Sequence, residues 1–121
     1  MMVVKNIKVM SACEHHFVPF IWQAFVAYIP REKVIGLSKI NRIVNFYSRK
    51  PQVQERLTEE IYADLKEKLW TEDVAVMIKA KHYCVVMRWV EDINSSTVTS
   101  KMWWVFMEDP NARKEFLELI K

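Results

Sequence analysis

The chain has 121 residues, a length that fits one domain spanning residues 1–121, and its 51% apolar and 27% charged residues are typical of a folded globular protein. The net charge of +3 arises from Lys and Arg residues that are spread along the chain, which argues against a nucleic-acid partner. No apolar run approaches the roughly 20 residues that span a bilayer, and the first residues lack the features of an export signal, so we expect a cytoplasmic protein with no membrane partner.

Two β-strands and a helix are predicted for the first part of the chain. Residues 3–10 and 19–29 are rich in β-branched and aromatic side chains, and a segment that contains Cys13 and Pro19 separates them, so each is expected to form a strand. After a polar turn, apolar residues recur at helical spacing behind Ser38, whose hydroxyl suits an N-cap. The apolar positions of this helix are Ile40, Ile43, Val44 and Tyr47.

A second helix and a long strand are predicted for the middle of the chain. Pro51 suits an early helical position, and apolar residues then recur at every fourth position along one stripe. These residues are Val53, Leu57, Ile61, Leu65 and Leu69. From Val74 to Arg88 the side chains alternate with period two, which predicts a strand with His82 and Cys84 on one face.

A hairpin and a terminal helix complete the expected fold. A polar turn at 91–95 leads into a last strand over 97–107, and Asp109 and Pro110 form the cap and the first position of the helix. The order is therefore ββααββ with a helical tail. This order predicts an α+β fold in which an antiparallel sheet carries its helices on one face.

The use of glycine and tryptophan is unusual. Gly36 is the only glycine in the sequence, so left-handed turns must be made by other residues. The five tryptophans, most of them on predicted strands, indicate broad apolar faces that neighbouring subunits would cover. We therefore expect the protein to self-associate.

All the cysteines and histidines fall into two short clusters, one with Cys13, His15 and His16 and the other with His82 and Cys84. In a reducing compartment, such cysteines are more often catalytic or metal-binding than joined in a disulfide. Zinc accepts thiolate sulfur and imidazole nitrogen, and a catalytic zinc uses three protein ligands and leaves one position for water. A structural zinc would instead use both cysteines and two histidines, and the spacing leaves both types of site open.

Several segments match one known family. They are SACEHHFVPF at 11–20, VIGLSK at 34–39, RIV at 42–44, YSR at 47–49, QVQERLT at 52–58, HYCVVMR at 82–88 and STVTS at 96–100. In these segments, and in their order, the sequence closely resembles the GTP cyclohydrolase I family. The resemblance runs from about residue 3 to residue 120.

The resemblance implies the tunnelling fold, in which ββααββ subunits join edge to edge into a β-barrel, commonly a pentamer doubled into a decamer. Closure of this kind pairs the strand edges that would otherwise be open. The family generally carries an N-terminal helical segment that adds assembly contacts and part of the pocket, and here we expect a short form without it. Trp22, Trp89 and Trp104 stand where the family often has glycine, and their bulk would narrow a pocket or reshape a subunit contact.

The resemblance also implies a zinc-dependent hydrolase that acts on a cyclic amidine and converts GTP to 7,8-dihydroneopterin triphosphate and formate. Cys13, His16 and Cys84 would be the zinc ligands. His15 and His82 would be the acid/base pair around the imidazole ring of the purine.

The expected substrate contacts come from the same resemblance. Glu55 would anchor guanine, because two carboxylate oxygens can accept from its adjacent N1 and N2 donors, which adenine does not offer together. Gln54 and the backbone near Leu37 and Ser38 would complete the base pocket. The triphosphate contacts would be Ser38, Lys39, Arg42 and Arg88.

Two other functions stay open at this point. A related purine or pterin enzyme of 7-deazaguanine synthesis would share the first chemical step. A catalytically impaired, zinc-stabilised oligomer would hold a guanine nucleotide without turnover, as the unmatched segment and the Trp replacements favour. Metal removal separates a structural site, whose loss unfolds the protein, from a catalytic one, whose loss stops turnover while much of the fold remains.

Overall fold

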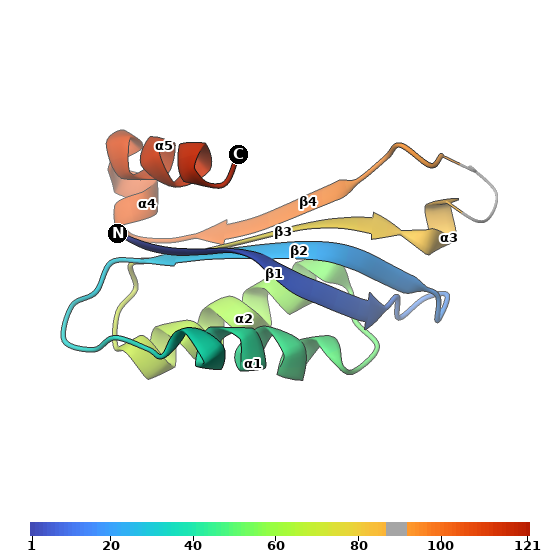
Figure 1. Ribbon diagram of the computed structural model, residues 1–121, viewed down its shortest axis with the longest axis horizontal. Helices are drawn as coiled ribbons and strands as arrows, with labels where there is room; N and C mark the ends of the chain where they lie inside the picture. Colours follow the sequence, from blue (N-terminus) through green and yellow to red (C-terminus); the bar gives the residue numbers. More distant parts are fainter. Residues whose placement is uncertain (87–91) are drawn as a thin grey trace.

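The computed structural model describes residues 1–86 and 92–121, and within these residues the chain forms an antiparallel sheet with helices packed against it (Figure 1). The sheet has four strands in the order β1-β2-β3-β4. The strands are β1 (Met2–Ala12), β2 (Pro19–Tyr28), β3 (Val74–His82) and β4 (Thr97–Met102). The helices are α1 (Leu37–Ser48), α2 (Gln54–Leu69), α3 (Tyr83–Val86), α4 (Val105–Glu108) and α5 (Pro110–Leu119). The predicted α+β class, the antiparallel pairing and the ββααββ order are confirmed.

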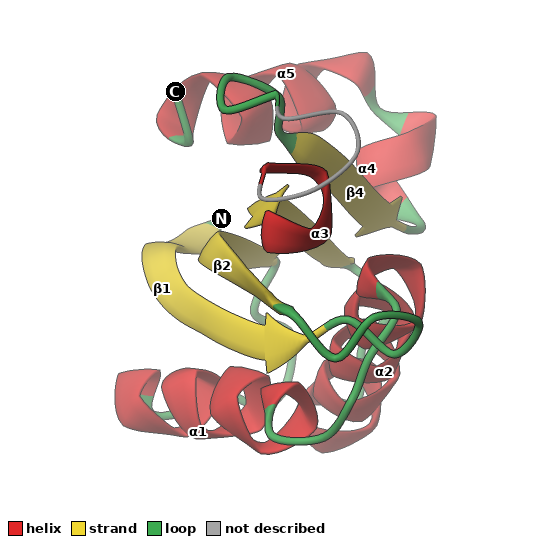
Figure 2. Ribbon diagram, turned by 90° about the vertical axis from the view of Figure 1, so that its right-hand side faces the viewer, coloured by secondary structure: helices red, strands yellow, loops and turns green. Residues whose placement is uncertain are grey.

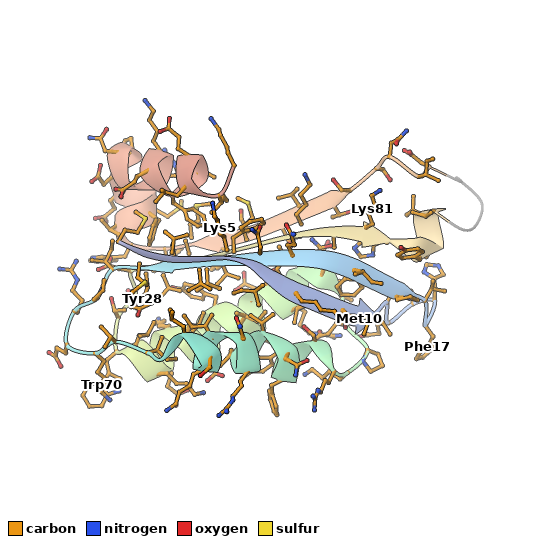
Figure 3. All side chains as sticks on the ribbon, viewed as in Figure 1. Lys5, Met10, Phe17, Tyr28, Trp70 and Lys81 are labelled. Carbon is orange, nitrogen blue, oxygen red and sulfur yellow. The ribbon has the colours of Figure 1, made fainter. Side chains whose placement is uncertain are left out.

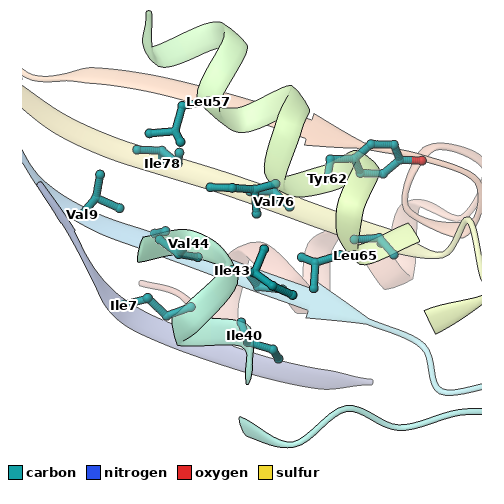
Figure 4. Packing of buried hydrophobic residues seen from close by; sticks show 14 of the residues in the cluster. Ile7, Val9, Ile40, Ile43, Val44, Leu57, Tyr62, Leu65, Val76 and Ile78 are labelled. Atoms are coloured by element: carbon teal, nitrogen blue, oxygen red, sulfur yellow. The ribbon is translucent and has the colours of Figure 1, made fainter. Parts of the chain in front are cut away.

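The main core lies between one face of the sheet and the helices α1 and α2 (Figure 4). Strand β3 presents alternate residues to this core, as its period-two pattern predicts. The residues involved are Val74, Val76, Ile78 and Ala80. The apolar stripes of the two helices meet them, and Ile40, Val44, Leu57, Ile61 and Leu65 are fully buried. The packing of α2 against β3 in this core sets the position of the first turn of α2 relative to His82, the last residue of β3.

The opposite face of the sheet is also covered, and the prediction that the helices occupy one face is therefore wrong. Figure 2 shows α4 and α5 on the side of the sheet away from α1 and α2. Phe106 and Phe116 are fully buried there, with ring centroids 5.9 Å apart, against Phe25 and the small residues Ala27 and Ala75. Because the second face of β2 and β3 is itself apolar, it needs cover, and the helical tail supplies it.

Two predicted strands end earlier than their side-chain patterns indicate. Strand β3 stops at His82 rather than Arg88, because His82 pairs with Phe20 and the next residue would face Pro19, which has no N–H for the ladder. Strand β4 stops at Met102 rather than at residue 107. Trp104 has a φ of 50°, which takes the backbone out of the strand and into α4.

The helix starts were only partly predicted. Helix α1 begins at Leu37 with Gly36 as its N-cap, so the assignment of Ser38 as the cap is wrong. Pro51 lies before α2, whose N-cap is Val53. Asp109 does cap α5, where its carboxylate accepts a hydrogen bond from Asn111 N at 2.8 Å. None of the helices in the described part of the chain is both long and apolar enough to cross a membrane.

Left-handed backbone conformations occur at residues other than glycine, as the glycine scarcity predicts. Asn6, Phe17, Trp70 and Trp104 have φ values of 60°, 53°, 54° and 50°, whereas Gly36 has an ordinary φ of −60°. Trp70 takes this conformation at the C-terminal end of α2, a position at which glycine is common. Phe17 takes it in the turn that contains the cysteine and histidines of the first cluster.

Replacement of Phe116 tests whether the tail covers the second face of the sheet. Phe116→Ala removes a fully buried ring and should lower the free energy of unfolding by about 3 to 5 kcal/mol. Leu119→Ala is the matched control, because Leu119 is on the same helix but is 46% exposed, and it should change stability by about 0.5 kcal/mol or less. Urea unfolding measures both, and equal losses would contradict this packing.

Candidate metal centre and active site

The turn that follows β1 holds Cys13 in a fixed, buried position. Cys13 N donates to Val18 O at 2.9 Å, and Phe17 N donates to Cys13 O at 2.8 Å, so the turn closes on itself. Gln52, in the segment before α2, donates from its N to Ala12 O at 2.8 Å and accepts from Glu14 N at 2.9 Å. These bonds tie the turn to the start of α2. Cys13 is consequently 8% exposed although it lies in a loop.

The second cluster arrives at the same place from β3. His82 is the last residue of the strand, and its ring stacks on that of Phe20, its cross-strand neighbour, with centroids 4.7 Å apart and planes 14° apart. Cys84 follows in the one-turn helix α3 (Figure 2). The expectation that His82 and Cys84 lie together is confirmed. The prediction that both are on one strand is wrong, because β3 ends at His82 and Cys84 is in α3.

Cys13, His82 and Cys84 form a group that could hold a metal ion, since their ligand atoms all lie within 4.8 Å of one another. Burial raises the pKa of the Cys84 thiol, and the neighbouring Cys13 thiol raises it further. Burial also lowers the pKa of His82, although the Glu55 carboxylate opposes this shift. A cation that binds here must therefore displace a thiol proton. Two thiols and an imidazole are the donor types that zinc accepts.

The other two histidines lie on the exposed side of the Cys13 turn. His16 Nδ1 is 3.7 Å from Cys13 Sγ, and the rings of His15 and His16 have centroids 6.2 Å apart. Both side chains are exposed. The structure thus places His16 beside one thiol, while the compact group of three contains His82 instead. The ligand set Cys13, His16 and Cys84 stays a prediction.

The first turn of α2 supplies the next two predicted residues. Gln54 is buried, and its Oε1 is 2.6 Å from His82 Nε2. Glu55 is exposed beside it and lines a cavity of about 370 Å³ together with Arg56, Thr58, Glu59, Thr99 and Ser100. Sequence reasoning assigned Gln54 to substrate alone and missed its contact with His82. That contact depends on the register between α2 and β3, for which the sequence carries no local signal.

The predicted contacts on α1 lie far from the thiols within one chain. Leu37, Ser38 and Lys39 are exposed at the start of α1, close to Tyr28, whose hydroxyl accepts from Ile35 N at 3.4 Å. Tyr28 and Phe20 are at opposite ends of β2, and eight residues of strand span roughly 25 Å. Figure 3 shows Tyr28 and Phe17 at opposite ends of the molecule.

Two basic residues complete the list of predicted contacts. Arg42 is exposed further along α1, where it lines a cavity of about 530 Å³ with Lys8 and Arg49. Arg88 lies outside the described residues, as does Trp89. Among the described residues, one chain therefore brings together the cysteines, His82, Gln54 and Glu55, but not the α1 residues expected to bind the triphosphate.

The fold and this site define the class of protein: an α+β domain in which the sulfur and imidazole donors of Cys13, His82 and Cys84 meet at one end of an antiparallel sheet. The profile of the family described as GTP cyclohydrolase I matches residues 1–121. The chain belongs to the GTP cyclohydrolase I family, which confirms the resemblance seen in its sequence segments.

Individual relatives agree with this assignment. GTP cyclohydrolase 1 of Flavobacterium johnsoniae is 56% identical over 121 residues, which are 100% of this chain and 54% of that protein. GTP cyclohydrolase 1 of Rattus norvegicus is 52% identical over 100% of this chain and 50% of its own length. The Homo sapiens protein of the same name is 51% identical, with 100% and 48% covered. The chain thus spans about half the length of these curated relatives.

Oxidation of the metal-free protein tests the proximity of the two thiols. Because both sulfurs lie within 4.8 Å, small side-chain rotations can bring them to the ~2.05 Å of a disulfide. Mild oxidation should therefore link Cys13 to Cys84 within one chain, detected by mass spectrometry of an unreduced digest. The same treatment in urea is the control and should give this link much more slowly. Thiols that stay free in the folded protein would contradict the geometry.

Proposed function

We propose that this chain is the catalytic part of a zinc-dependent GTP cyclohydrolase, which converts GTP to 7,8-dihydroneopterin triphosphate and formate. The observation that carries this proposal is the meeting of Cys13, His82 and Cys84, from two segments of a chain that belongs to the GTP cyclohydrolase I family. The names of the relatives support the same activity. The site also holds the groups that a metal-dependent hydrolase needs. These are thiol and imidazole donors for a metal ion and, nearby, the exposed carboxylate of Glu55.

Cys13, Cys84 and His16 would hold the zinc ion. The donor set fits this metal, and the 3.7 Å contact between His16 and Cys13 supports His16 as the third ligand because a small movement of its exposed ring brings it to the thiols. Bound zinc supplies a Lewis acid that activates water at neutral pH. His82 and His15 would then move protons to and from the purine imidazole ring during its opening.

Glu55 would select guanine. Its carboxylate is exposed at the first turn of α2, next to Gln54 and close enough to His82 to influence its pKa. Two carboxylate oxygens accept together from the N1 and N2 donors of guanine, whereas adenine does not offer this pair. Leu37 and Ser38 of another copy of the chain would complete the base pocket through their backbone.

The triphosphate contacts on α1 would come from another copy of the chain. Ser38, Lys39 and Arg42 are these candidates, and the first two lie roughly 25 Å along the sheet from the thiols of their own chain. Arg88 is the fourth candidate and follows Cys84 closely in the sequence. Strands β1 and β4 are the edges of the sheet, so edge-to-edge association can place the α1 end of one copy at the metal end of another. We propose a homo-oligomer of this kind, a pentamer or a decamer, with the strands joined into a barrel.

Turnover of GTP tests the proposed activity. The zinc-loaded protein should release formate and produce the absorbance of a pterin from GTP, while ATP, the matched control substrate, should give neither product. Both products are measured in the same reaction. Protein that binds zinc and assembles but forms neither product from GTP would contradict the proposal and favour a nucleotide-binding role.

Subunit complementation tests whether the site is shared. A Cys84→Ser chain and a Lys39→Ala/Arg42→Ala chain should each be inactive alone. If each site combines one chain's thiols with another chain's α1, random equal mixing restores both halves in about a quarter of the sites. Co-expression followed by the formate assay measures this fraction. A mixture with no activity would mean that each chain uses its own α1. A Lys39→Ala/Arg42→Ala chain that is active alone would mean that these α1 residues are not required.

A further inference from the structure

Gln54 is buried and engages its whole side-chain amide inside the protein. Its exposed fraction is 1%. The two hydrogens of the amide nitrogen are shared among three acceptors, Ile78 O at 3.1 Å, Thr97 O at 3.0 Å and Thr99 Oγ1 at 3.1 Å. The amide oxygen lies 2.6 Å from His82 Nε2. One side chain therefore joins α2 to β3, to β4 and to the imidazole of the site.

The orientation of this amide is determined by its neighbours. Carbonyl oxygens such as those of Ile78 and Thr97 can only accept hydrogen bonds, so the group that faces them must be the NH₂. A flipped amide would place an oxygen about 3 Å from two other oxygens with no proton between them. The oxygen of the Gln54 amide is consequently the atom that faces His82.

Two threonine hydroxyls reinforce the same orientation. Thr58 Oγ1 donates to the main-chain oxygen of Gln54 at 2.9 Å, which uses its one proton. Thr58 and Thr99 are joined at 2.8 Å, so Thr99 must be the donor of that bond. The oxygen of Thr99 is then left to accept from the Gln54 amide nitrogen. Every donor and acceptor in this small network has one consistent direction.

The imidazole has little freedom to avoid this contact. Its stacking on the fully buried ring of Phe20, with planes 14° apart, holds the plane of the imidazole. An amide oxygen has no proton to give, so the short contact requires that His82 Nε2 carries a hydrogen and donates it. In the neutral ring, the lone pair then resides on Nδ1.

We propose that Gln54 is a positioning residue that holds His82 in the tautomer with its proton on Nε2, so that Nδ1 is the nitrogen that exchanges protons with the substrate. The catalytic meaning of this inference rests on the proposed function, but the tautomer does not. The inference also changes the role expected for Gln54, because an amide fully engaged within the protein has no free group to offer the guanine base.

The tautomer can be read from the nitrogen chemical shifts of His82 by NMR of histidine-labelled, zinc-loaded protein. We expect protonated Nε2 and unprotonated Nδ1, with a slowly exchanging Nε2 proton. Gln54→Met keeps the length of the side chain but removes the acceptor, and this proton should then exchange rapidly. A wild-type ring protonated on Nδ1 would overturn the proposal. If Gln54→Met fails to fold, the wild-type tautomer alone decides.

Gln52→Met is the matched control. Gln52 is a second fully buried glutamine in the same segment, and its amide is also engaged, with Tyr47 O at 2.9 Å, Glu60 Oε2 at 3.0 Å and Arg56 Nε at 3.1 Å, but not with His82. Both substitutions remove a buried amide and should destabilise the protein. Only Gln54→Met should change the exchange of the His82 proton, and an equal change in both variants would overturn the proposal.

Kinetics separate a positioning role from a base-binding role. Loss of a group that orients a metal-bound histidine typically costs roughly 10- to 100-fold, and we expect a similar cost for the orienting contact of His82. Gln54→Met should therefore lower kcat for ring opening by roughly 10- to 100-fold with little change in GTP affinity. Weaker GTP binding with unchanged kcat would overturn the positioning role. If the wild-type protein does not turn over GTP, the proposed function fails, whereas the NMR result still decides the tautomer.

Discussion

The pairing of Phe20 with His82 is the last step of the antiparallel ladder between β2 and β3, and the positions of the other groups in the site follow from where that ladder stops. Pro19 cannot continue it, because it has no N–H to donate. Strand β3 therefore gives way to α3 at Tyr83. On the N-terminal side of Pro19, the turn that contains Cys13 connects β1 to β2. One interruption of the ladder thus places the two cysteine-bearing segments side by side.

The start of α2 is the second support of the site. Gln52 and Gln54 are both fully or nearly fully buried, and each uses its amide to join elements that are distant in sequence. Gln52 fixes the Cys13 turn through its backbone, and Gln54 fixes the ring of His82 through its side chain. Glu55, which follows Gln54 in the sequence, remains exposed to solvent. The same helix turn therefore combines buried structural contacts with one exposed carboxylate.

Much of the fold could be predicted from the sequence, and the errors have physical causes. The period-two pattern of β3 correctly identified its buried face, but the pattern continues past His82 into residues 83–86, which form α3 instead. Phe106 was predicted to lie on a strand and Phe116 in a helical tail. No local sequence pattern shows that Phe25 and Ala75 leave the second face of the sheet uncovered. The cysteines and histidines were recognisable as a cluster, whereas the contact of Gln54 with His82 requires the three-dimensional register.

X-ray absorption at the zinc edge of the zinc-loaded protein can show whether Cys13 and Cys84 share one metal ion. If they do, the spectrum should show two sulfur ligands at about 2.3 Å and at least one imidazole nitrogen at about 2.0 Å. A coordination shell made of nitrogen and oxygen alone, or one that contains a single sulfur, would contradict a shared ion.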